Sequence, residues 1–340
     1  MKASSIKSEL ESYASTVNEF ILSSIDGKPK ELYQASSHLM RTGGKRLRPF
    51  MVIKSCEMLG GTVKRALPAA AAVELVHNFT LVHDDIMDND EMRHGTATVH
   101  RYYGMPLAIL AGDILFSKSF QLITFNGRKT GIPDRDITNM VAQLSRACTE
   151  ICEGQATDIG FASSSKFPKD DDYIKMIRKK TAALFEVSCA LGALSAPNHT
   201  ERDVENLSSF GRNIGIAFQL VDDLIGVVGD PKLTGKAAGN DIREGKKTYP
   251  ILLALNSLNN PKDKEKKDKI LKVFGAGDRV SSADIKEAVK VISDIGIEQD
   301  VRNAARKHMN DALKAIEGYG DSDARRSLQF SADFVVGRSL

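Results

Sequence analysis

The stretch PAAAAVELVHNFTLVHDDIMDND, residues 68–90, joins a long apolar segment to a cluster of aspartates. Apolar residues at spacings of three and four recur almost throughout the chain, as in Ile6, Leu10, Tyr13 and Val17. Sustained two-residue alternation, which is typical of strands, is missing. The sequence therefore predicts an all-α protein. The predicted helices cover residues 4–22, 28–40, 47–59, 66–88, 104–126, 135–160, 170–194 and 201–226, followed by shorter ones to about 336.

The composition is that of a globular protein, since 42% of the 340 residues are apolar, 27% are charged and no low-complexity tract occurs. The net charge of +3 is small for this length, so no global field favours nucleic acid or an anionic membrane as a partner. None of the loops resembles an interdomain linker, including the long loop at 229–247. We expect a single all-α domain over residues 1–340.

The cellular location is indicated by three features. The four cysteines lack Cys-x2-Cys spacing, and the chain is too large to need disulfide staples, which favours a reducing compartment. The N-terminal MKASSIKSELESYAS lacks the apolar core of a signal peptide. No run reaches about 18 apolar residues. We therefore expect a cytoplasmic protein without a membrane span.

Two acidic clusters follow apolar helical segments. Asp84 and Asp88 are four residues apart, so a helix places them on one face, where their mutual repulsion favours a shared divalent cation. Mg2+ fits such oxygen ligands, because it is typically held by one or two carboxylates together with substrate phosphates. The alternative is a helix end that runs into solvent. Asp222 and Asp223, after IGIAFQLV, favour the metal site, because two acidic helix ends around one cavity suggest a diphosphate ligand.

Cationic residues suited to a diphosphate lie in glycine-rich or helix-end settings. GGKRLRP sets Lys45 and Arg48 on one flexible arm, and Arg93 follows the first acidic cluster. Further candidates are Lys180, Lys236 and Lys246. A solvated surface cation also explains any one of these side chains. His77 lies two helical turns before Asp84 on nearly the same face, so a donor to phosphate and a structural histidine are both open interpretations of it.

Taken together, several segments resemble the trans-isoprenyl diphosphate synthases. They are GGKRLRP, HNFTLVHDDIMDND, MRHGTATVH, LAGDILF, EGQATD, KKTAALFE, FQLVDDLIGVVGD and TGKAAGNDIREGKKT, in the family's order over about residues 40–250. A DDIMD motif without insertion and the glycine of DDLIG are most similar to the archaeal geranylgeranyl diphosphate synthases. The resemblance implies the isoprenoid synthase fold, with helices surrounding a deep central pocket, two aspartate motifs at its mouth, and a homodimer.

The resemblance also implies roles for the residues that match its motifs. Those implied for two or three Mg2+ ions bridging the allylic diphosphate are Asp84, Asp88 and Asp222, with Asp85 nearby. Those implied for isopentenyl diphosphate, held without metal, are Lys45, Arg48 and His77. Those implied for the allylic diphosphate are Arg93, Lys180, Lys236 and Lys246, while Thr181 and Gln219 would line the reacting region.

The implied reaction is a head-to-tail condensation of isopentenyl diphosphate with dimethylallyl, geranyl or farnesyl diphosphate. Ionisation of the allylic diphosphate separates charge, which metals and fixed cations stabilise. The C3–C4 alkene of isopentenyl diphosphate then attacks C1 away from water, and the released diphosphate takes the final proton. The alternative of a noncatalytic partner subunit is disfavoured, because such chains generally lose an aspartate motif or the cationic set.

Two positions depart from the family pattern. His94 stands where a second arginine is usual, so one permanent cation of the isopentenyl diphosphate site becomes titratable. We expect His94→Arg to tighten binding of isopentenyl diphosphate, most clearly above neutral pH. Gly226 takes the place of the third aspartate in the second motif, which removes a possible metal ligand and leaves Asp222 intact.

Product length in this family is commonly set by the fifth and fourth residues before the first aspartate motif, here Phe79 and Thr80. Thr80 is small, whereas farnesyl-producing relatives tend to carry aromatic residues at both positions. A single Phe79 is similar to the pattern of twenty-carbon synthases. We therefore expect geranylgeranyl diphosphate as the main product and a longer one from Phe79→Ala. The alternative is a farnesyl or mixed farnesyl/geranylgeranyl product.

Overall fold

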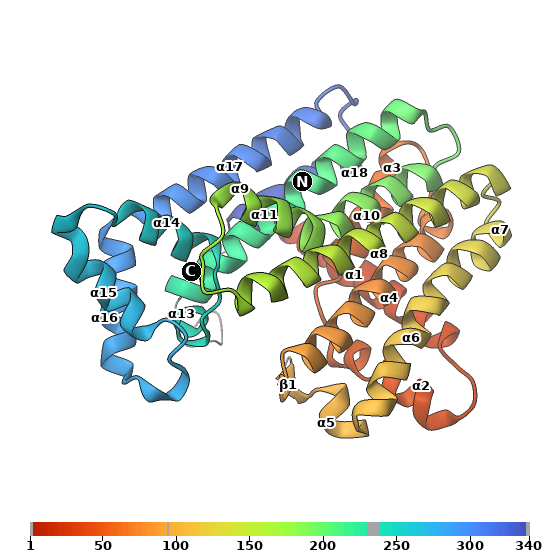
Figure 1. Ribbon diagram of the computed structural model, residues 1–340. Coiled ribbons are helices and arrows are strands. Elements are labelled where there is room, and N and C mark those ends of the chain that lie inside the picture. The colour runs from red at the N-terminus through yellow and green to blue at the C-terminus, as the bar shows by residue number, and fades with distance from the viewer. Residues whose placement is uncertain (1–2, 94, 230–237, 338–340) are drawn as a thin grey trace. The chain divides into compact units, whose positions relative to one another are not determined.

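The computed structural model describes residues 3–93, 95–229 and 238–337, which are helical almost throughout (Figure 1). The all-α prediction is confirmed. The helices are α1 (Ala3–Ser24), α2 (Lys30–Ser37), α3 (Leu47–Met58), α4 (Val63–Met87), α5 (Val99–Tyr103), α6 (Met105–Gln121), α7 (Gly127–Lys129), α8 (Asp134–Ser163), α9 (Asp170–Ile177), α10 (Ala183–Ser195), α11 (Glu201–Val228), α13 (Asn240–Glu244), α14 (Tyr249–Ser257), α15 (Lys264–Val273), α16 (Ser282–Asp294), α17 (Ile297–Ala315) and α18 (Asp323–Val336).

Shorter elements connect these helices. The 3-10 turns are η1 (Leu39–Thr42), η4 (Pro261–Asp263) and η5 (Gly277–Arg279), and the π-helical turns are η2 (Leu122–Asn126) and η3 (Arg178–Ala182). The sheet in the described part of the chain is one antiparallel hairpin of β1 (Met92–Arg93) and β2 (Thr96–Ala97).

The chain divides into two compact units, each assembled from separate stretches. Unit 1 comprises Met1–Cys148, Leu184–Gly211 and Ile316–Ser331. Unit 2 comprises Thr149–Ala183, Arg212–Ala315 and Ala332–Leu340. The single domain expected over residues 1–340 stays a prediction.

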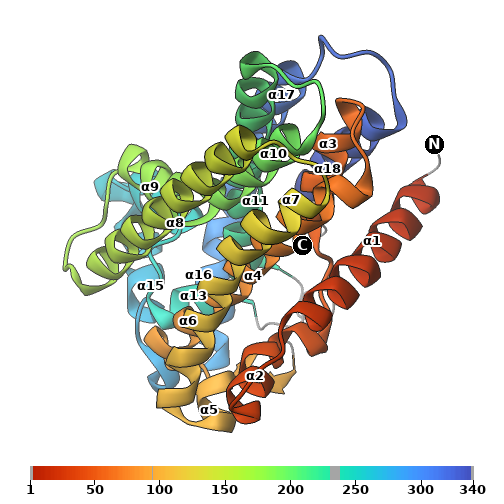
Figure 2. The ribbon, with the colours of Figure 1, turned by 90° about the vertical axis from the view of Figure 1, so that its right-hand side faces the viewer.

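Helix α4 forms the centre of unit 1. The Thr62 side chain caps its first turn by accepting a hydrogen bond from the backbone N–H of Arg65. Its segment AAAAVELV, residues 69–76, is buried throughout. A helix that is buried on all sides needs neighbours all round, and α4 packs against α1, α3 and α6 (Figures 1 and 2). The chain can therefore present its aspartates only where α4 leaves this packing, at its C-terminal turn.

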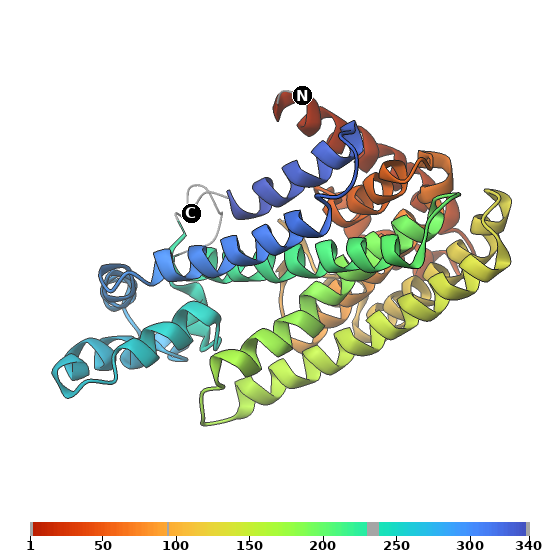
Figure 3. The same ribbon diagram turned by 90° about the horizontal axis from the view of Figure 1, so that it is seen from above.

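In unit 2, the C-terminal part of α11 lies beside α17. Figure 3 shows the two helices, green and blue, running along each other, and His308 Nδ1 lies 2.9 Å from Asn213 Oδ1. Helices α14 and α16 also pack against α17. The stretch of α11 that leads to the second aspartate motif is buried at several positions, including Ile214 and Leu220.

The predicted helices differ from the observed ones mainly in two internal breaks. The predicted helix 104–126 consists of α6 and the π turn η2, and the predicted helix 170–194 consists of α9, the π turn η3 and α10. A π turn keeps the apolar periodicity on either side while inserting one residue, so the pattern does not reveal it. The β1–β2 hairpin escaped prediction because two-residue strands are too short to show alternation.

Candidate active site

The glycine-rich arm before α3 carries the predicted cations of the isopentenyl diphosphate site. Lys45 is exposed, and Arg48 is half-buried in the first turn of α3. The Arg48 guanidinium stacks on the Phe185 ring, 4.2 Å from its centroid, and its Nη1 lies 3.4 Å from His77 Nε2. The structure therefore brings Arg48 and His77 together, as the sequence predicts for ligands of one diphosphate.

The first aspartate motif occupies the C-terminal turn of α4. Asp84 is half-buried, whereas Asp88 is exposed and caps the helix, its N–H donating to the carbonyl of Asp84 at 2.8 Å. A helix C-terminus carries partial negative charge, so carboxylates there are electrostatically unfavourable unless a cation is near. The placement of Asp84 and Asp88 thus favours a bound cation.

Asp85 has a different environment from its neighbours in the motif. Its buried carboxylate forms an ion pair with Nε of Arg93, which lies on β1 and also reaches Asp90 Oδ2 at 3.4 Å. Burial raises the pKa of Asp85, and the positive charge of Arg93 opposes that rise. Arg93, expected on the allylic diphosphate, is thereby held against the first motif. The metal-binding role expected of Asp85 stays a prediction.

Phe79 and Thr80, the two residues expected to set product length, are neighbours on α4. The Phe79 ring packs against His83 at 4.8 Å and against Phe116 of α6 at 5.3 Å between centroids. Thr80 donates its hydroxyl to the carbonyl of His77, so its polar group is satisfied within the helix. Phe79 is therefore one side of an aromatic contact that joins α4 to α6.

In unit 2, the predicted lysine pair lies on the π turn η3. Lys180 forms an ion pair with Asp158 of α8 at 2.5 Å, and Lys179 pairs with Glu153 at 2.7 Å. Gly154 of α8 makes this approach possible, because a Cβ at that position would lie only 2.3 Å from the backbone nitrogen of Lys180. π-helical turns are frequent at functional sites, so the turn is itself a sign of function.

A chain of hydrogen bonds joins η3 to the second aspartate motif. Thr181 donates to Gln219 Oε1 at 2.7 Å, and Gln219 Nε2 donates to Asp223 Oδ1 at 2.8 Å. The other carboxylate oxygen of Asp223 accepts from the hydroxyl of Tyr173 at 2.6 Å. Burial is the main reason that the pKa of Asp223 is raised to about 8. Neutral donors therefore fix the orientation of this carboxylate, while Asp222 beside it is half-buried.

Gly226 replaces the third aspartate of the second motif, and the structure leaves no room for a side chain at this position. A Cβ at this position would lie 2.0 Å from Oδ2 of Asp241, the second residue of α13. The carboxylate of Asp241 therefore fills the space that a side chain at 226 would need. The space is acidic even though the motif lacks its third aspartate.

The loop after the second motif is described in part. Lys246 is exposed and pairs with Glu244 at 2.8 Å, whereas its neighbour Lys247 donates to carbonyls at the end of α8, including that of Phe161 at 2.6 Å. Two further residues with predicted roles, Lys236 and His94, lie outside the described residues. Of the cations predicted in this loop, the structure therefore places Lys246.

A sequence profile described as polyprenyl synthetase matches residues 29–292. The chain belongs to this family. It is 42% identical to geranylgeranyl diphosphate synthase of Sulfolobus acidocaldarius, with 95% of this chain and 96% of the relative covered. It is 40% identical to a short chain isoprenyl diphosphate synthase of Methanocaldococcus jannaschii, covering 92% and 90%. Its structure is similar to that of geranylgeranyl pyrophosphate synthetase from Pyrococcus horikoshii, with a TM-score of 0.90, 38% identity and full coverage of both chains.

In this polyprenyl synthetase, three residues that sequence reasoning missed contact predicted site or motif residues. Phe116 and Asp241 belong to segments that carry the family resemblance, LAGDILF and TGKAAGNDIREGKKT, so their motif membership was an available signal. Tyr173 lies in KDDDYIKM, where nothing local distinguishes it from a core residue. Its contact with Asp223 depends on the packing of unit 2.

The acidic residues of this polyprenyl synthetase fit a magnesium ion that is held jointly by the protein and by substrate phosphates. Within residues 3–93, 95–229 and 238–337, no three His, Cys, Asp or Glu side chains are grouped closely enough to hold a metal ion by themselves. Mg2+ typically takes one or two carboxylates, several waters and substrate phosphates. Asp84 and Asp88 supply hard oxygen ligands of that kind at a helix end that favours a cation.

One described segment of the synthetase, Met105–Lys129, has the length and apolar composition of a membrane span. Of its apolar stretch of 18 residues, 39% is buried. It comprises α6, η2 and α7. Core helices of proteins without a span pass the same test, so the indication is weak. The segment leaves four large apolar side chains exposed: Met105, Ile109, Leu110 and Phe125.

Proposed function

We propose that this chain is a geranylgeranyl diphosphate synthase, which condenses isopentenyl diphosphate head-to-tail with allylic diphosphates. One observation supports the proposal above the others. Helix α4 presents His77, which meets Arg48, and two turns later the carboxylates Asp84 and Asp88. Cationic and metal-type ligands for diphosphates thus follow each other along one buried helix. The similarity to curated archaeal synthases of this product supports the same assignment.

Isopentenyl diphosphate binds to Lys45, Arg48 and His77 in this proposal. Stacking on Phe185 restrains the Arg48 guanidinium, so less freedom is lost when it binds phosphate oxygens. Lys45 is exposed on the glycine-rich arm, next to Arg46. These residues hold the substrate that carries the nucleophilic alkene.

The allylic diphosphate binds to a cationic set and to magnesium. The cations are Arg93, Lys180, Lys246 and Lys236, and the proposed metal ligands are Asp84, Asp88 and Asp222 for two or three ions. Asp85, which pairs with Arg93, contributes by holding that cation. Magnesium supplies charge stabilisation for the departing diphosphate. The side chains Arg93 and Lys180 orient the same group so that its C1–O bond can break.

The bond-forming step takes place next to Thr181 and Gln219. The allylic C1–O electrons leave with the diphosphate, and the C3–C4 alkene of isopentenyl diphosphate attacks C1. The new tertiary cation then loses a proton to the released diphosphate, which restores a double bond. The Thr181–Gln219 hydrogen bond keeps two polar groups satisfied beside a short-lived cation that must be sheltered from water.

Phe79 limits product length in this proposal, with Phe116 as its neighbour across α4 and α6. We expect Phe79→Ala to shift the main product from twenty to twenty-five carbons or more. Chromatography of products labelled from isopentenyl diphosphate measures this shift. An unchanged product distribution would refute Phe79 as the stop, and a fifteen-carbon main product from the wild type would favour farnesyl diphosphate synthase.

A homodimer is part of the proposal. Contiguous exposed apolar surface is typical of interaction sites, and Met105, Ile109 and Leu110 provide it on α6. We expect Ile109→Glu with Leu110→Glu to yield monomers in light scattering coupled to size exclusion. Leu271→Glu, at an exposed apolar residue of α15, is the control and should leave the mass unchanged. A wild-type monomer would contradict the proposal. The cytoplasmic location stays a prediction.

The deciding experiment is an incubation of the purified chain with magnesium, isopentenyl diphosphate and each of dimethylallyl, geranyl and farnesyl diphosphate. We expect geranylgeranyl diphosphate from all three primers. The chain mutated at Asp84 to Asn is the matched blank for contaminating synthases. Absence of turnover with every primer would overturn the proposed function.

A further inference from the structure

Arg46, the central cation of GGKRLRP, has an unusual backbone. Its φ of 48° and ψ of 41° place it in the left-handed region, which a residue with a Cβ adopts only at a cost. Of the described non-glycine residues, only Arg46 and Asn89 have positive φ. The first helical turn of α3 begins immediately after it, and the N–H of Phe50 donates to its carbonyl at 3.0 Å. This left-handed backbone stands between the two predicted phosphate ligands, Lys45 and Arg48.

The Arg46 side chain is fixed by three elements of unit 1. Its Nη1 donates to Glu74 Oε1 of α4 at 2.7 Å, and its Nε donates to Asn18 Oδ1 of α1 at 2.9 Å. Its Nη2 donates to the carbonyl of Met40 in η1 at 3.0 Å. Exposed fractions of 7% for the Arg46 side chain and 2% for that of Glu74 keep both charges out of reach of a phosphate ligand. The Arg46 guanidinium is therefore bound within the protein and buried, whereas Lys45 is exposed and Arg48 is half-buried.

Glu74 is the anchor of this arrangement. Its Oε1 also accepts from Asn78 Nδ2 at 2.9 Å within α4. Burial raises the pKa of Glu74, and the charges of Arg46 and Arg48 oppose the rise. A buried charge needs a partner, so the pair holds together strongly and its planar geometry restricts the guanidinium to one orientation.

We propose that Arg46, clamped by Glu74, is a positioning residue that fixes the isopentenyl diphosphate subsite without touching the substrate. Lys45 precedes it by one residue and Arg48 follows it by two, so a change in its left-handed turn redirects both. Without the clamp, the arm has two adjacent glycines, Gly43 and Gly44, and no reason to keep this path. The inference rests on the proposed function, since it assigns these ligands to isopentenyl diphosphate.

The test separates positioning from simple stability. In Arg46→Met combined with Glu74→Met, apolar side chains replace the buried pair, a change that often preserves stability. We expect the KM for isopentenyl diphosphate to rise about tenfold or more, because small misplacements of binding groups are costly in such sites. The KM for geranyl diphosphate and the melting temperature should stay close to those of the wild type. Arg46→Lys keeps the charge but cannot span three acceptors, so it should give an intermediate KM.

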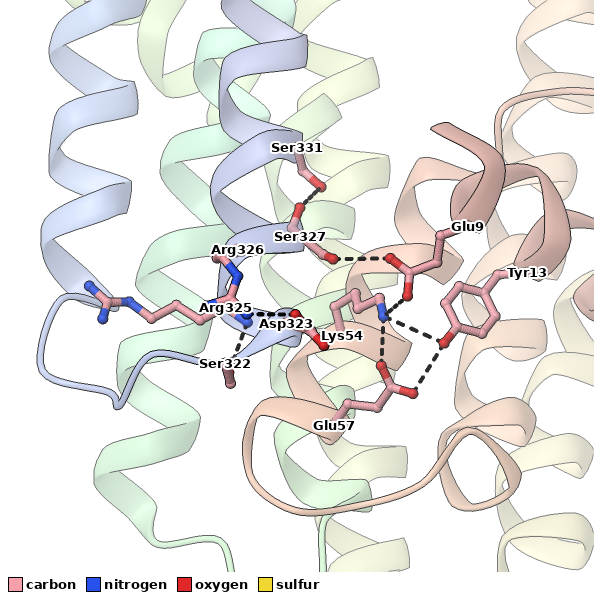
Figure 4. Close-up of polar contacts among 10 residues, drawn as sticks. All are labelled: Glu9, Tyr13, Lys54, Glu57, Ser322, Asp323, Arg325, Arg326, Ser327 and Ser331. Carbon is pink, nitrogen blue, oxygen red and sulfur yellow. Dashed lines mark hydrogen bonds and ion pairs between the residues drawn. The ribbon is translucent and has the colours of Figure 1, made fainter. Parts of the chain in front are cut away.

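The polar contacts of Lys54, drawn in Figure 4, offer a matched control. Lys54 on α3 is buried like Arg46 and also reaches α1, with its Nζ bonded to Glu9 and Glu57 and 3.4 Å from the Tyr13 hydroxyl. Ser327 of α18 donates to the same Glu9 at 3.0 Å. We expect Lys54→Met to lower the melting temperature and leave the KM for isopentenyl diphosphate unchanged. A KM rise equal to that of the clamp variants would assign the effect to general docking of α1 and overturn the proposal.

Further outcomes of the same experiment are also decisive. An unchanged KM for isopentenyl diphosphate in the folded double variant overturns the inference and leaves the proposed function standing. Equal rises for both substrates also overturn it, since the clamp would then not act on one subsite. If the double variant does not fold, Arg46→Lys decides by the same comparison of the two KM values. A wild type that forms no product overturns the proposed function, and the inference with it.

Discussion

The two aspartate motifs lie on different units and hold their carboxylates by different physical means. In unit 1, the buried Asp85 is paired with a cation, Arg93. In unit 2, the buried Asp223 is held by two neutral donors, Tyr173 and Gln219. Burial is the main cause that raises the pKa of Asp223 to about 8, although the two hydrogen bonds oppose the rise. The same short motif thus produces two electrostatic environments, depending on what packs against it.

The motifs also differ in where their third carboxylate originates. In the first, Asp88 follows Asp84 on the same helix. In the second, the equivalent position is Gly226, and Asp241 of α13 lies against it. The motif alone therefore does not show every carboxylate of the acidic cluster, because a residue from a distant segment can fill the space of a missing aspartate.

The largest expected effect comes from removing one carboxylate of either motif. We expect Asp84→Asn and Asp222→Asn each to lower kcat roughly 10²–10³-fold, the loss typical of removing one electrostatic stabiliser of a transition state. Glu91→Gln, at an exposed surface ion pair with Arg101, is the control and should keep wild-type turnover. Steady-state kinetics with geranyl diphosphate measures all three. If one motif tolerates the change, the two are not equivalent in charge stabilisation.

Gly226→Ala tests whether Asp241 fills the gap in the second motif. The added Cβ would collide with the Asp241 carboxylate, and overpacking of this kind costs about 1–3 kcal/mol of the free energy of unfolding. Gly160→Ala is the control, because it lies on α8 of the same unit with no neighbour within 4 Å, and it should stabilise by about 0.5–1 kcal/mol. Urea denaturation compares the variants. Equal stabilities would mean that α13 moves away from Gly226 without cost.

Tyr173→Phe tests the neutral support of Asp223. The variant leaves one buried carboxylate oxygen without its donor, which we expect to cost about 1–3 kcal/mol of unfolding free energy. Tyr249→Phe removes a hydroxyl from the ring that stacks on Tyr173 without touching Asp223, so its effect should be smaller. Chemical denaturation measures both. A Tyr173→Phe protein as stable as the wild type would show that the hydroxyl is not needed to hold the carboxylate.

The smallest expected effect concerns the reactivity of the cysteine thiols, which reports on packing in the two units rather than on the charge of the motifs. Burial raises the pKa of Cys56 and Cys189 in unit 1 to about 12, so these thiols should react slowly with iodoacetamide at pH 8. Cys152 of unit 2 is exposed and should be labelled first. Peptide mass spectrometry of the native protein gives the order of labelling. Early labelling of Cys189 would indicate that the packing around Phe185 opens readily.

Much of the fold could be predicted because helical periodicity is local. The predicted boundaries 47–59 and 201–226 differ from α3 and α11 by no more than two residues at each end. The π turn at Lys180 could not be predicted, since it depends on the close approach of Gly154 on another helix. The same holds for the candidate site: the motifs indicated Arg48 and His77, which the structure places 3.4 Å apart, but gave no sign of Tyr173.

By itself, the sequence determined the helical class and the chemical kinds of ligand, because apolar spacing and the identity of side chains are properties of single segments. Only the tertiary structure decided which charges are available. Arg46 and Arg48 stand two residues apart in one motif, yet Arg46 is buried against Glu74 while Arg48 lies beside His77. Asp84 and Asp85 are adjacent, yet Asp85 is buried in an ion pair with Arg93 of β1, whereas Asp84 is half-buried. Burial and pairing arise from contacts between distant segments, which a motif read along the chain does not show.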